Sequence, residues 1–276
     1  MNLIINDNDS KNGGYIMSDR IPVVYEDMVD ADLNRESKYE LIWDYIIDDG
    51  NEHPIAIIVP GGGYGCVCSF VEGKPFAKYL NRKGISAVIL YYRVREEAKF
   101  PNPQDDLAKA VKEVSARADE LKLDMKNYSI WGSSTGGHLV GSFGTNNMGY
   151  PKYGIAKPAA LVLIYPVITM DPSYTHDGTM ENLISNNLSA EDIKFYSVDT
   201  NVTKDYPPTY IWCGDIDDVV PPKNTEDMIK ALNNAGVPVG YKIAKGVGHG
   251  AGLAYETDAE GWIDEAIDFW MEQKNK

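Results

Sequence analysis

The sequence predicts an α/β protein built on a doubly wound, mainly parallel sheet. Apolar, β-branched segments alternate with helical patterns along most of the 276 residues. Strands of this kind are typical of a parallel sheet covered by helices, because both faces of each strand are buried. No linker-like stretch or internal repeat interrupts the alternation, so residues 21–276 are expected to form a single domain. Residues 1–20 are polar and aperiodic, which predicts a loose leader and leaves Met1 and Met17 as alternative starts.

Eight segments have the composition of buried strands. They are residues 21–25, 39–47, 54–60, 85–92, 127–131, 159–165, 208–213 and 239–244. Helical patterns lie between the later candidates, and the clearest places Leu107, Val111 and Val114 on one helix face. No helical pattern separates the first two candidates, which predicts an antiparallel ribbon leading into the parallel part.

Composition and charge narrow the classes of function. A hydrophobic content of 43% with 24% charged residues is that of a globular protein. The net charge of −15 repels phosphate backbones and anionic lipid, so neither nucleic acid nor a membrane is an expected partner. No long apolar run or signal peptide is recognisable, which predicts a cytoplasmic protein. Three cysteines form neither a disulfide framework nor a metal site by their spacing.

Residues 171–200 depart from the strand and helix alternation. The segment is polar and lies between two strand candidates. Ligands of open α/β sheets bind beyond the carboxyl ends of the strands. A long excursion at that edge therefore predicts a small cap over the site.

The segment Gly132-Ser133-Ser134-Thr135-Gly136 has the G-x-S-x-G pattern between a predicted strand and a predicted helix. In that context the pattern indicates a nucleophile elbow, in which a sharp turn projects the serine above the sheet. The glycines are needed because side chains two residues before and after the serine would collide with the neighbouring strand and helix. We therefore expect Ser134 to be a nucleophile.

A working serine needs a histidine base and an acid, which follow it along the chain in this class of fold. His249 lies in a glycine-rich loop between the last predicted strand and the last predicted helix, where the base is expected. Three carboxylates compete for the role of the acid after residues 208–213. Asp217 is favoured by its spacing, with Asp218 and Asp215 as alternatives.

The run Pro60-Gly61-Gly62-Gly63-Tyr64 follows a predicted strand and suits an oxyanion loop, whose glycines let the main chain approach a substrate carbonyl. A phosphate-binding loop is excluded because Cys68 and Pro75 stand where a Walker A motif needs glycine and Ser or Thr. A dinucleotide-binding GxGxxG is excluded because Cys66 replaces its last glycine.

Four motifs, taken in chain order, resemble those of the α/β-hydrolase serine esterases. They are Pro-Gly-Gly-Gly-Tyr, Gly-x-Ser-x-Gly-Gly-His, Asp-x-Val-Val-Pro and Gly-His-Gly. The chain is most similar to their acetyl-xylan-esterase and feruloyl-esterase-like branch of carbohydrate esterases. The likeness includes Val-Glu-Gly-Lys-Pro at residues 71–75 and runs from about residue 50 to 265. Thr135 stands where alanine is usual in the elbow.

The resemblance implies an ester hydrolase of α/β-hydrolase fold that needs no metal or organic cofactor. Ser134 would attack, His249 would carry the proton and Asp217 would orient the imidazole. The N–H groups of Gly62, Gly63 and Thr135 would hold the oxyanion.

Short acyl esters, acetyl above all, of small sugars or other alcohols are the expected substrates. Tyr64 and His176 are expected substrate contacts in a small, polar pocket. An oligopeptidase-like serine peptidase and a non-catalytic binding module of the same fold remain alternatives. A homo-oligomer is possible.

Overall fold

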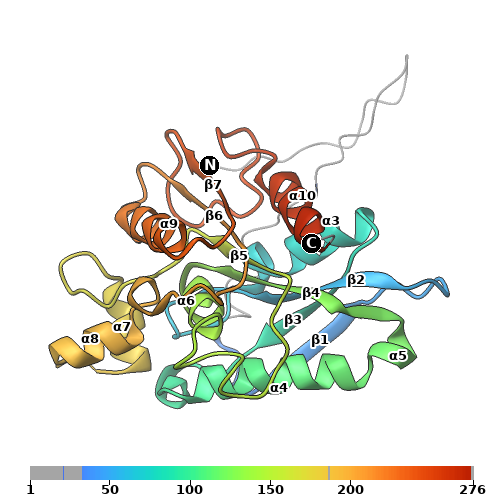
Figure 1. Cartoon of the computed structure of the whole chain (residues 1–276), viewed down its shortest axis with the longest axis horizontal. Coiled ribbons are helices and arrows are strands. Elements are labelled where there is room, and N and C mark those ends of the chain that lie inside the picture. The colour runs from blue at the N-terminus through green and yellow to red at the C-terminus, as the bar shows by residue number, and fades with distance from the viewer. Residues whose placement is uncertain (1–20, 22–32, 186, 275–276) are drawn as a thin grey trace.

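A computed structural model describes residues 21, 33–185 and 187–274 and contains one mixed sheet with helices on both faces (Figure 1). Seven strands form the sheet in the described part of the chain. They are β1 (Glu40–Tyr45), β2 (His53–Val59), β3 (Ser86–Tyr91), β4 (Leu123–Ser133), β5 (Ala160–Ile164), β6 (Thr209–Gly214) and β7 (Val239–Ala244). Each coincides with one of the predicted strands.

The strand order is β1-β3-β2-β4-β5-β6-β7, with β1 antiparallel to β3 and all other neighbours parallel. The sheet therefore has seven described strands where the sequence predicted eight. The remaining candidate, residues 21–25, lies outside the described residues except for Ile21, which is not in a strand. The chain reverses its direction of winding between β2 and β4, and ligands of doubly wound sheets bind at such a switch point.

Helices and short 3₁₀ turns connect the strands. They are α2 (Ser69–Glu72), α3 (Lys74–Arg82), η1 (Arg95–Ala98), α4 (Asn102–Ala116), α5 (Ala118–Leu121), α6 (Ser134–Phe143), α7 (Asp177–Leu183), α8 (Ala190–Tyr196), η2 (Asp199–Asn201), α9 (Lys223–Ala235) and α10 (Trp262–Lys274). Helices α3 and α10 lie side by side on one face of the sheet, and α4 packs with α6 on the other (Figure 1).

The long helices form where the sequence predicts an apolar stripe. In α4, Leu107, Val111 and Val114 are buried against the sheet. Helix α9 ends at Gly236, whose φ of +70° is a left-handed conformation that glycine adopts without a steric penalty.

Three fully buried tryptophans join the sheet to α10. The ring of Trp262 lies 5.4 Å from that of Trp212 on β6 and 6.1 Å from that of Trp131 on β4. Its indole Nε1 donates to the Gly252 carbonyl at 3.0 Å. This contact anchors the loop that carries His249 to the core.

The predicted cap segment, residues 171–200, contains α7 and α8 and lies at one end of the molecule beside α6 (Figure 1). The His138 ring on α6 donates through Nε2 to the Tyr196 carbonyl on α8 at 2.9 Å. The Asn182 side-chain amide on α7 donates to the Gly63 carbonyl at 2.8 Å. The segment is thus tied both to the elbow helix and to the glycine loop.

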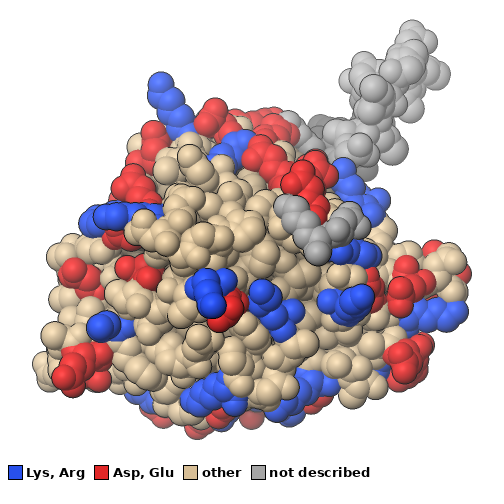
Figure 2. All heavy atoms as spheres, viewed as in Figure 1, with Lys and Arg blue, Asp and Glu red and all other residues tan. Residues whose placement is uncertain are grey.

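Most of the face shown in Figure 2 is uncharged, with charged side chains of both signs scattered over it. Lysines and arginines are scattered among acidic and uncharged residues on that face. Among the described residues, no helix has the length and apolarity needed to cross a membrane.

Removing the Trp262 side chain should destabilise the fold strongly, because it leaves a cavity beside two other buried indoles. We expect Trp262→Ala to lower the free energy of unfolding by about 3–5 kcal/mol in urea denaturation. Ile216→Ala is the matched control, since that side chain is 61% exposed and its truncation should cost less than about 0.5 kcal/mol. Equal losses in the two variants would contradict this account of the core.

Candidate active site

Ser134 lies at a sharp turn between the end of β4 and the start of α6. Its φ of +52° is a left-handed conformation that is strained for a residue with a side chain. A Cβ on Gly132 would lie 2.3 Å from the Gly136 carbonyl oxygen, and a Cβ on Gly136 would lie 2.1 Å from the Val59 carbonyl oxygen. Both glycines are therefore required by the close approach of β2, β4 and α6.

His249 and Asp217 complete a hydrogen-bonded chain with this serine. Ser134 Oγ lies 2.9 Å from His249 Nε2, and His249 Nδ1 lies 2.7 Å from Asp217 Oδ2. The carboxylate can only accept, so Nδ1 carries the proton and Nε2 is left to accept from the serine hydroxyl. Such an arrangement can take the serine proton as the oxygen attacks a substrate.

Asp217 differs from its two acidic neighbours in burial and in partners. It is 4% exposed, and its Oδ1 accepts from the backbone N–H groups of Val219 and Val220 at 3.1 and 2.8 Å. Asp215 and Asp218 are exposed, and Asp215 accepts instead from the Gly246 N–H at 2.6 Å. Of the three candidates, Asp217 is thus the one in contact with His249.

The glycine loop after β2 lies directly beside Ser134. Gly62 and Gly63 have φ values of +128° and +64°, and a Cβ on Gly62 would lie 2.4 Å from the Cys66 carbonyl oxygen. The Gly63 N–H donates to Thr135 Oγ1 at 2.9 Å. Thr135 is the second residue of α6, so its N–H has no acceptor within the helix.

These N–H groups differ in their availability to a substrate oxygen. Gly62 and Gly63 both line the cavity, but the Gly63 N–H already donates to the Thr135 side chain. The Thr135 N–H lies in the first turn of α6, where it has no acceptor within the helix. Gly62 and Thr135 are therefore the better placed of the three predicted donors.

A cavity of about 410 Å³ opens above the serine, within the range of small-molecule sites. Gly62, Ser134, His176, Val219 and His249 contribute to its walls. Ser134, His249, the glycine loop and the cap segment thus meet in one place.

His176 caps α7 with its ring and also lines this cavity. Its Nδ1 accepts from the Thr179 backbone N–H at 3.1 Å and lies 2.9 Å from Thr179 Oγ1. Burial, and secondarily the charge of His249, lower the pKa of His176. A neutral ring that accepts through Nδ1 carries its proton on Nε2, which makes that nitrogen a hydrogen-bond donor.

Tyr64 is placed differently from the prediction of a substrate contact. Its side chain is fully buried, and its hydroxyl pairs with His138 Nδ1 at 3.1 Å. With a φ of +55° at Tyr64, the ring packs in the core against the rings of Tyr92 and His138. The ring therefore packs on the core side of the glycine loop and does not line the cavity.

Glu72 and Val219 line the cavity as well, although the sequence did not single them out as site residues. Glu72 appeared only within the Val-Glu-Gly-Lys-Pro motif. A glutamate that follows the apolar pair Phe70-Val71, eight residues after Tyr64, was the available signal, because carboxylates are rarely buried without a partner.

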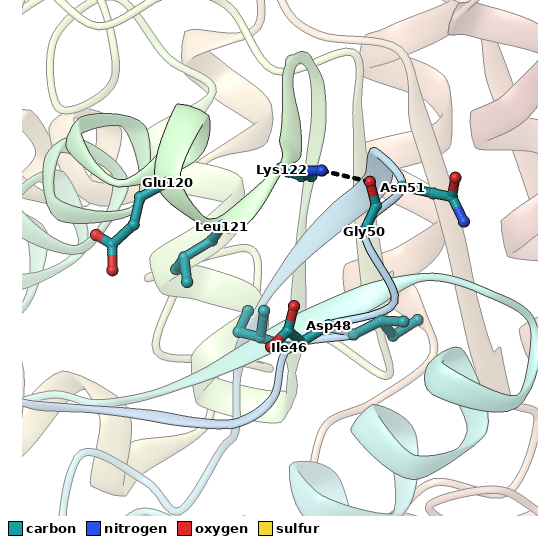
Figure 3. Close-up of a pocket in the computed structure, with 8 residues that line it drawn as sticks. Ile46, Asp48, Gly50, Asn51, Glu120, Leu121 and Lys122 are labelled. Carbon is teal, nitrogen blue, oxygen red and sulfur yellow. Dashed lines mark hydrogen bonds between the residues drawn. The ribbon is translucent and has the colours of Figure 1, made fainter.

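A second cavity, of about 360 Å³, lies at the opposite edge of the sheet (Figure 3). Its walls come from residues 46–51 and 120–122, which precede the starts of β2 and β4. Lys122 crosses it to the Gly50 carbonyl. Ser134 follows the far end of β4, so this cavity is separate from the candidate site.

The fold and the arrangement at Ser134 are those of an α/β-hydrolase. The chain belongs to the BD-FAE family, whose model matches residues 47–232.

Curated relatives include endo-1,4-beta-xylanase B of Butyrivibrio fibrisolvens, which is 29% identical over 88% of this chain and 39% of that protein. Another is an acetylxylan esterase of Xylanibacter ruminicola, 29% identical over 71% of this chain and 40% of that protein. The chain thus spans about two fifths of the length of these relatives.

Solved structures extend the comparison. An acetyl ester-xyloside bifunctional hydrolase from Caldicellulosiruptor lactoaceticus superposes with a TM-score of 0.73 at 30% identity, covering 92% of this chain and 93% of that one. The carboxylesterase Cest-2923 from Lactobacillus plantarum has a TM-score of 0.70 at 23% identity, covering 88% of this chain and 94% of that one, and supports the fold. Within the described residues, no group of three or more His, Cys, Asp or Glu side chains is arranged to hold a metal ion.

Asp217→Asn should lower kcat by about 10³- to 10⁴-fold while the protein stays folded, because an amide at this place favours the wrong imidazole tautomer. Asp215→Asn and Asp218→Asn are the matched controls and should stay within about threefold of the wild type, since neither contacts the histidine. Ester hydrolysis per folded molecule is the measurement. Similar losses in all three variants would mean that the carboxylates act as a structural cluster.

His138 should make folding stability depend on pH. Its neutral ring is fully buried with both nitrogens paired, and burial lowers its pKa from 6.5 to about 4. The unfolded chain takes up a proton near pH 6.5 and the folded protein does not. This contribution to stability is therefore present above pH 6.5 and is lost as the pH falls toward 4.

The wild type should be more stable than His138→Gln at pH 7, and this difference in the free energy of unfolding should fall by about 3 kcal/mol between pH 7 and pH 4. His53→Gln is the control of opposite sign, because a hydrogen bond to Asp49 raises the pKa of His53. Urea denaturation at several pH values is the measurement. A wild-type minus His138→Gln difference that stays constant with pH would contradict the account.

Proposed function

We propose that this protein is a serine carboxylic-ester hydrolase that forms an acyl-enzyme on Ser134. The supporting observation is a strained serine whose Oγ lies 2.9 Å from His249 Nε2, beside the Gly62 loop and the start of α6. Donors held at fixed positions around a developing oxyanion are the largest single contribution to catalysis in enzymes of this kind.

In the first half of the reaction, His249 Nε2 takes the hydroxyl proton as Ser134 Oγ bonds to the ester carbonyl carbon. The N–H groups of Gly62 and Thr135 receive the negative oxygen, and Asp217 stabilises the imidazolium. The C–O bond to the alcohol then breaks, and His249 returns the proton to the departing alkoxide. An acyl group remains on Ser134.

Water completes the cycle. His249 takes a proton from a water molecule, and the hydroxide oxygen bonds to the acyl carbon. Collapse of this second intermediate breaks the bond to Ser134 Oγ, and the serine oxygen recovers its proton from His249. The carboxylic acid then leaves the cavity.

Short acyl esters, acetyl above all, are the proposed substrates, with small sugars or other alcohols as the leaving groups. Support comes from relatives named acetylxylan esterase and acetyl ester-xyloside hydrolase. The cavity walls also carry the polar His176 ring from the cap segment and the Glu72 carboxylate, together with the apolar Val219. We assign the His176 Nε2–H to the alcohol side of the ester, where it can donate to a hydroxyl.

The two alternatives are not favoured. The esterase names of the relatives argue against a peptidase, and the hydrogen-bonded Ser134, His249 and Asp217 chain argues against a non-catalytic module. A cytoplasmic location and a homo-oligomer stay predictions.

Replacement of the nucleophile tests the proposal directly. Ser134→Ala should lower kcat on p-nitrophenyl acetate by about 10⁴- to 10⁶-fold with no change in unfolding. Ser133→Ala is the matched control and should keep most of its activity, because the structure pairs Ser134 with the histidine. Loss of activity in Ser133→Ala together with retained activity in Ser134→Ala would contradict the assignment of Ser134 as the nucleophile.

Acyl chain length tests the substrate class. The value of kcat/KM should be highest for acetyl and propionyl p-nitrophenyl esters and fall steeply beyond butyryl, because each further methylene must find apolar room worth about 0.8 kcal/mol. Peptide anilides should not be cleaved at a comparable rate. A maximum at octanoyl or longer would rule out the short-acyl proposal.

A further inference from the structure

Glu72 is a buried carboxylate in the candidate site that the proposed mechanism does not use. It is 5% exposed, ends the short helix α2 and lines the same cavity as Ser134. Removing a carboxylate from water is costly unless hydrogen bonds replace the lost hydration. Its partners therefore indicate what it does.

The first partner is the glycine loop. Glu72 Oε2 accepts from the Gly61 N–H at 2.7 Å, and the Gly61 carbonyl accepts from the Cys68 N–H at 2.9 Å. A Cβ on Gly61 would lie 2.7 Å from Ser134 Cβ and 2.8 Å from Glu72 Oε2. The residue before Gly62 is thus held on both its N–H and its carbonyl side, in contact with the serine.

Planarity of the peptide bond transmits this restraint to the next residue. In a trans peptide, the Gly62 N–H points opposite to the Gly61 carbonyl with which it shares a plane. The bond from the Cys68 N–H to the Gly61 carbonyl therefore sets the direction of the Gly62 N–H, while Glu72 holds the preceding peptide and so restrains Gly61 from its other side. The Gly62 N–H is one of the two proposed oxyanion donors.

The second partner is Tyr165, which links the carboxylate to the histidine loop. Its hydroxyl bonds to Glu72 and accepts from the Gly252 N–H at 3.3 Å. The Tyr165 and His249 rings pack edge to face with centroids 5.0 Å apart. One buried carboxylate thus lies between the loop of the oxyanion donors and the loop of the base.

We propose that Glu72 is a positioning residue that, by accepting the Gly61 N–H, aims the Gly62 N–H at the oxyanion. This inference rests on the proposed ester hydrolysis and adds a residue to it. Burial raises the pKa of Glu72, whereas hydrogen bonds from Gly61 and Tyr165 and the positive charge on His249 oppose that rise. Formation of the imidazolium during catalysis therefore favours the ionised carboxylate as the acceptor.

Three substitutions separate the acceptor from the charge. Glu72→Gln keeps an oxygen at the same reach and removes the charge. Glu72→Asp keeps the charge and withdraws the oxygen by one methylene, and Glu72→Ala removes both. Asp106→Asn is the matched control for loss of a buried carboxylate, since Asp106 is 3% exposed and pairs with Arg93 away from the cavity.

The measurement is kcat and KM on p-nitrophenyl acetate per active site, with sites counted by titration with an alkyl phosphonate ester and Ser134→Ala as the blank. Loss of one oxyanion donor costs about 10²- to 10³-fold in kcat. A misaimed donor should cost about 10- to 100-fold in Glu72→Ala and Glu72→Asp, with KM within about threefold. Glu72→Gln should stay within about fivefold of the wild type in kcat, and Asp106→Asn should change stability alone.

The results for these variants either support or overturn the positioning role of Glu72. Wild-type kcat in Glu72→Asp with a loss in Glu72→Gln would assign the effect to charge and overturn the positioning role. Unchanged kcat in all folded Glu72 variants would overturn it too, while Ser134-dependent turnover by the wild type would leave ester hydrolysis standing. A wild-type protein whose hydrolysis of p-nitrophenyl acetate does not depend on Ser134 would overturn the proposed function and this inference together. If Glu72→Ala does not fold, the Asp and Gln variants carry the same comparison.

Discussion

The close approach of β2, β4 and α6 around Ser134 is the constraint on which the candidate site depends. Gly136 on α6 fits against the Val59 carbonyl at the end of β2 only because it has no side chain, and Gly132 fits against Gly136 for the same reason. This contact holds Ser134 at a positive φ at the sheet edge. It also brings the loop that follows β2 against the serine, because that loop begins where the contact ends. The nucleophile and its proposed oxyanion donors are thus positioned by one packing interaction.

The segment over the site is joined to the same centre by a continuous chain of hydrogen bonds. The Gly63 N–H donates to Thr135 Oγ1, which lies 3.2 Å from Thr179 Oγ1 on α7, and Thr179 in turn pairs with His176. A threonine at the second position of α6 therefore connects the elbow, the glycine loop and the cap segment. An alanine at that place could not make these contacts. The cap segment and the glycine loop are thus connected through side chains of α6 and α7.

Local patterns were sufficient to predict the strands and the elbow, because these depend on residues close together in the chain. The apolar segments correspond to β1–β7, and the glycine spacing around Ser134 reflects contacts that any such turn must make. The side-chain direction of Tyr64 was not predictable, since it follows from a left-handed backbone and from a partner, His138, in a distant segment. Glu72 could not be assigned a role for the same reason, because Glu72 and its partners Gly61 and Tyr165 lie in three separate segments that meet only when the sheet is assembled.

The central claim is that Ser134 attacks while Gly62 and Thr135 receive the oxyanion. A crystal structure of the protein after reaction with a small alkyl phosphonate ester tests it most directly, because the adduct imitates the tetrahedral intermediate. The account predicts phosphorus bonded to Ser134 Oγ and a phosphonyl oxygen about 2.7–3.1 Å from the Gly62 and Thr135 nitrogens. Phosphorus on another residue, or a phosphonyl oxygen directed away from both nitrogens, would contradict it.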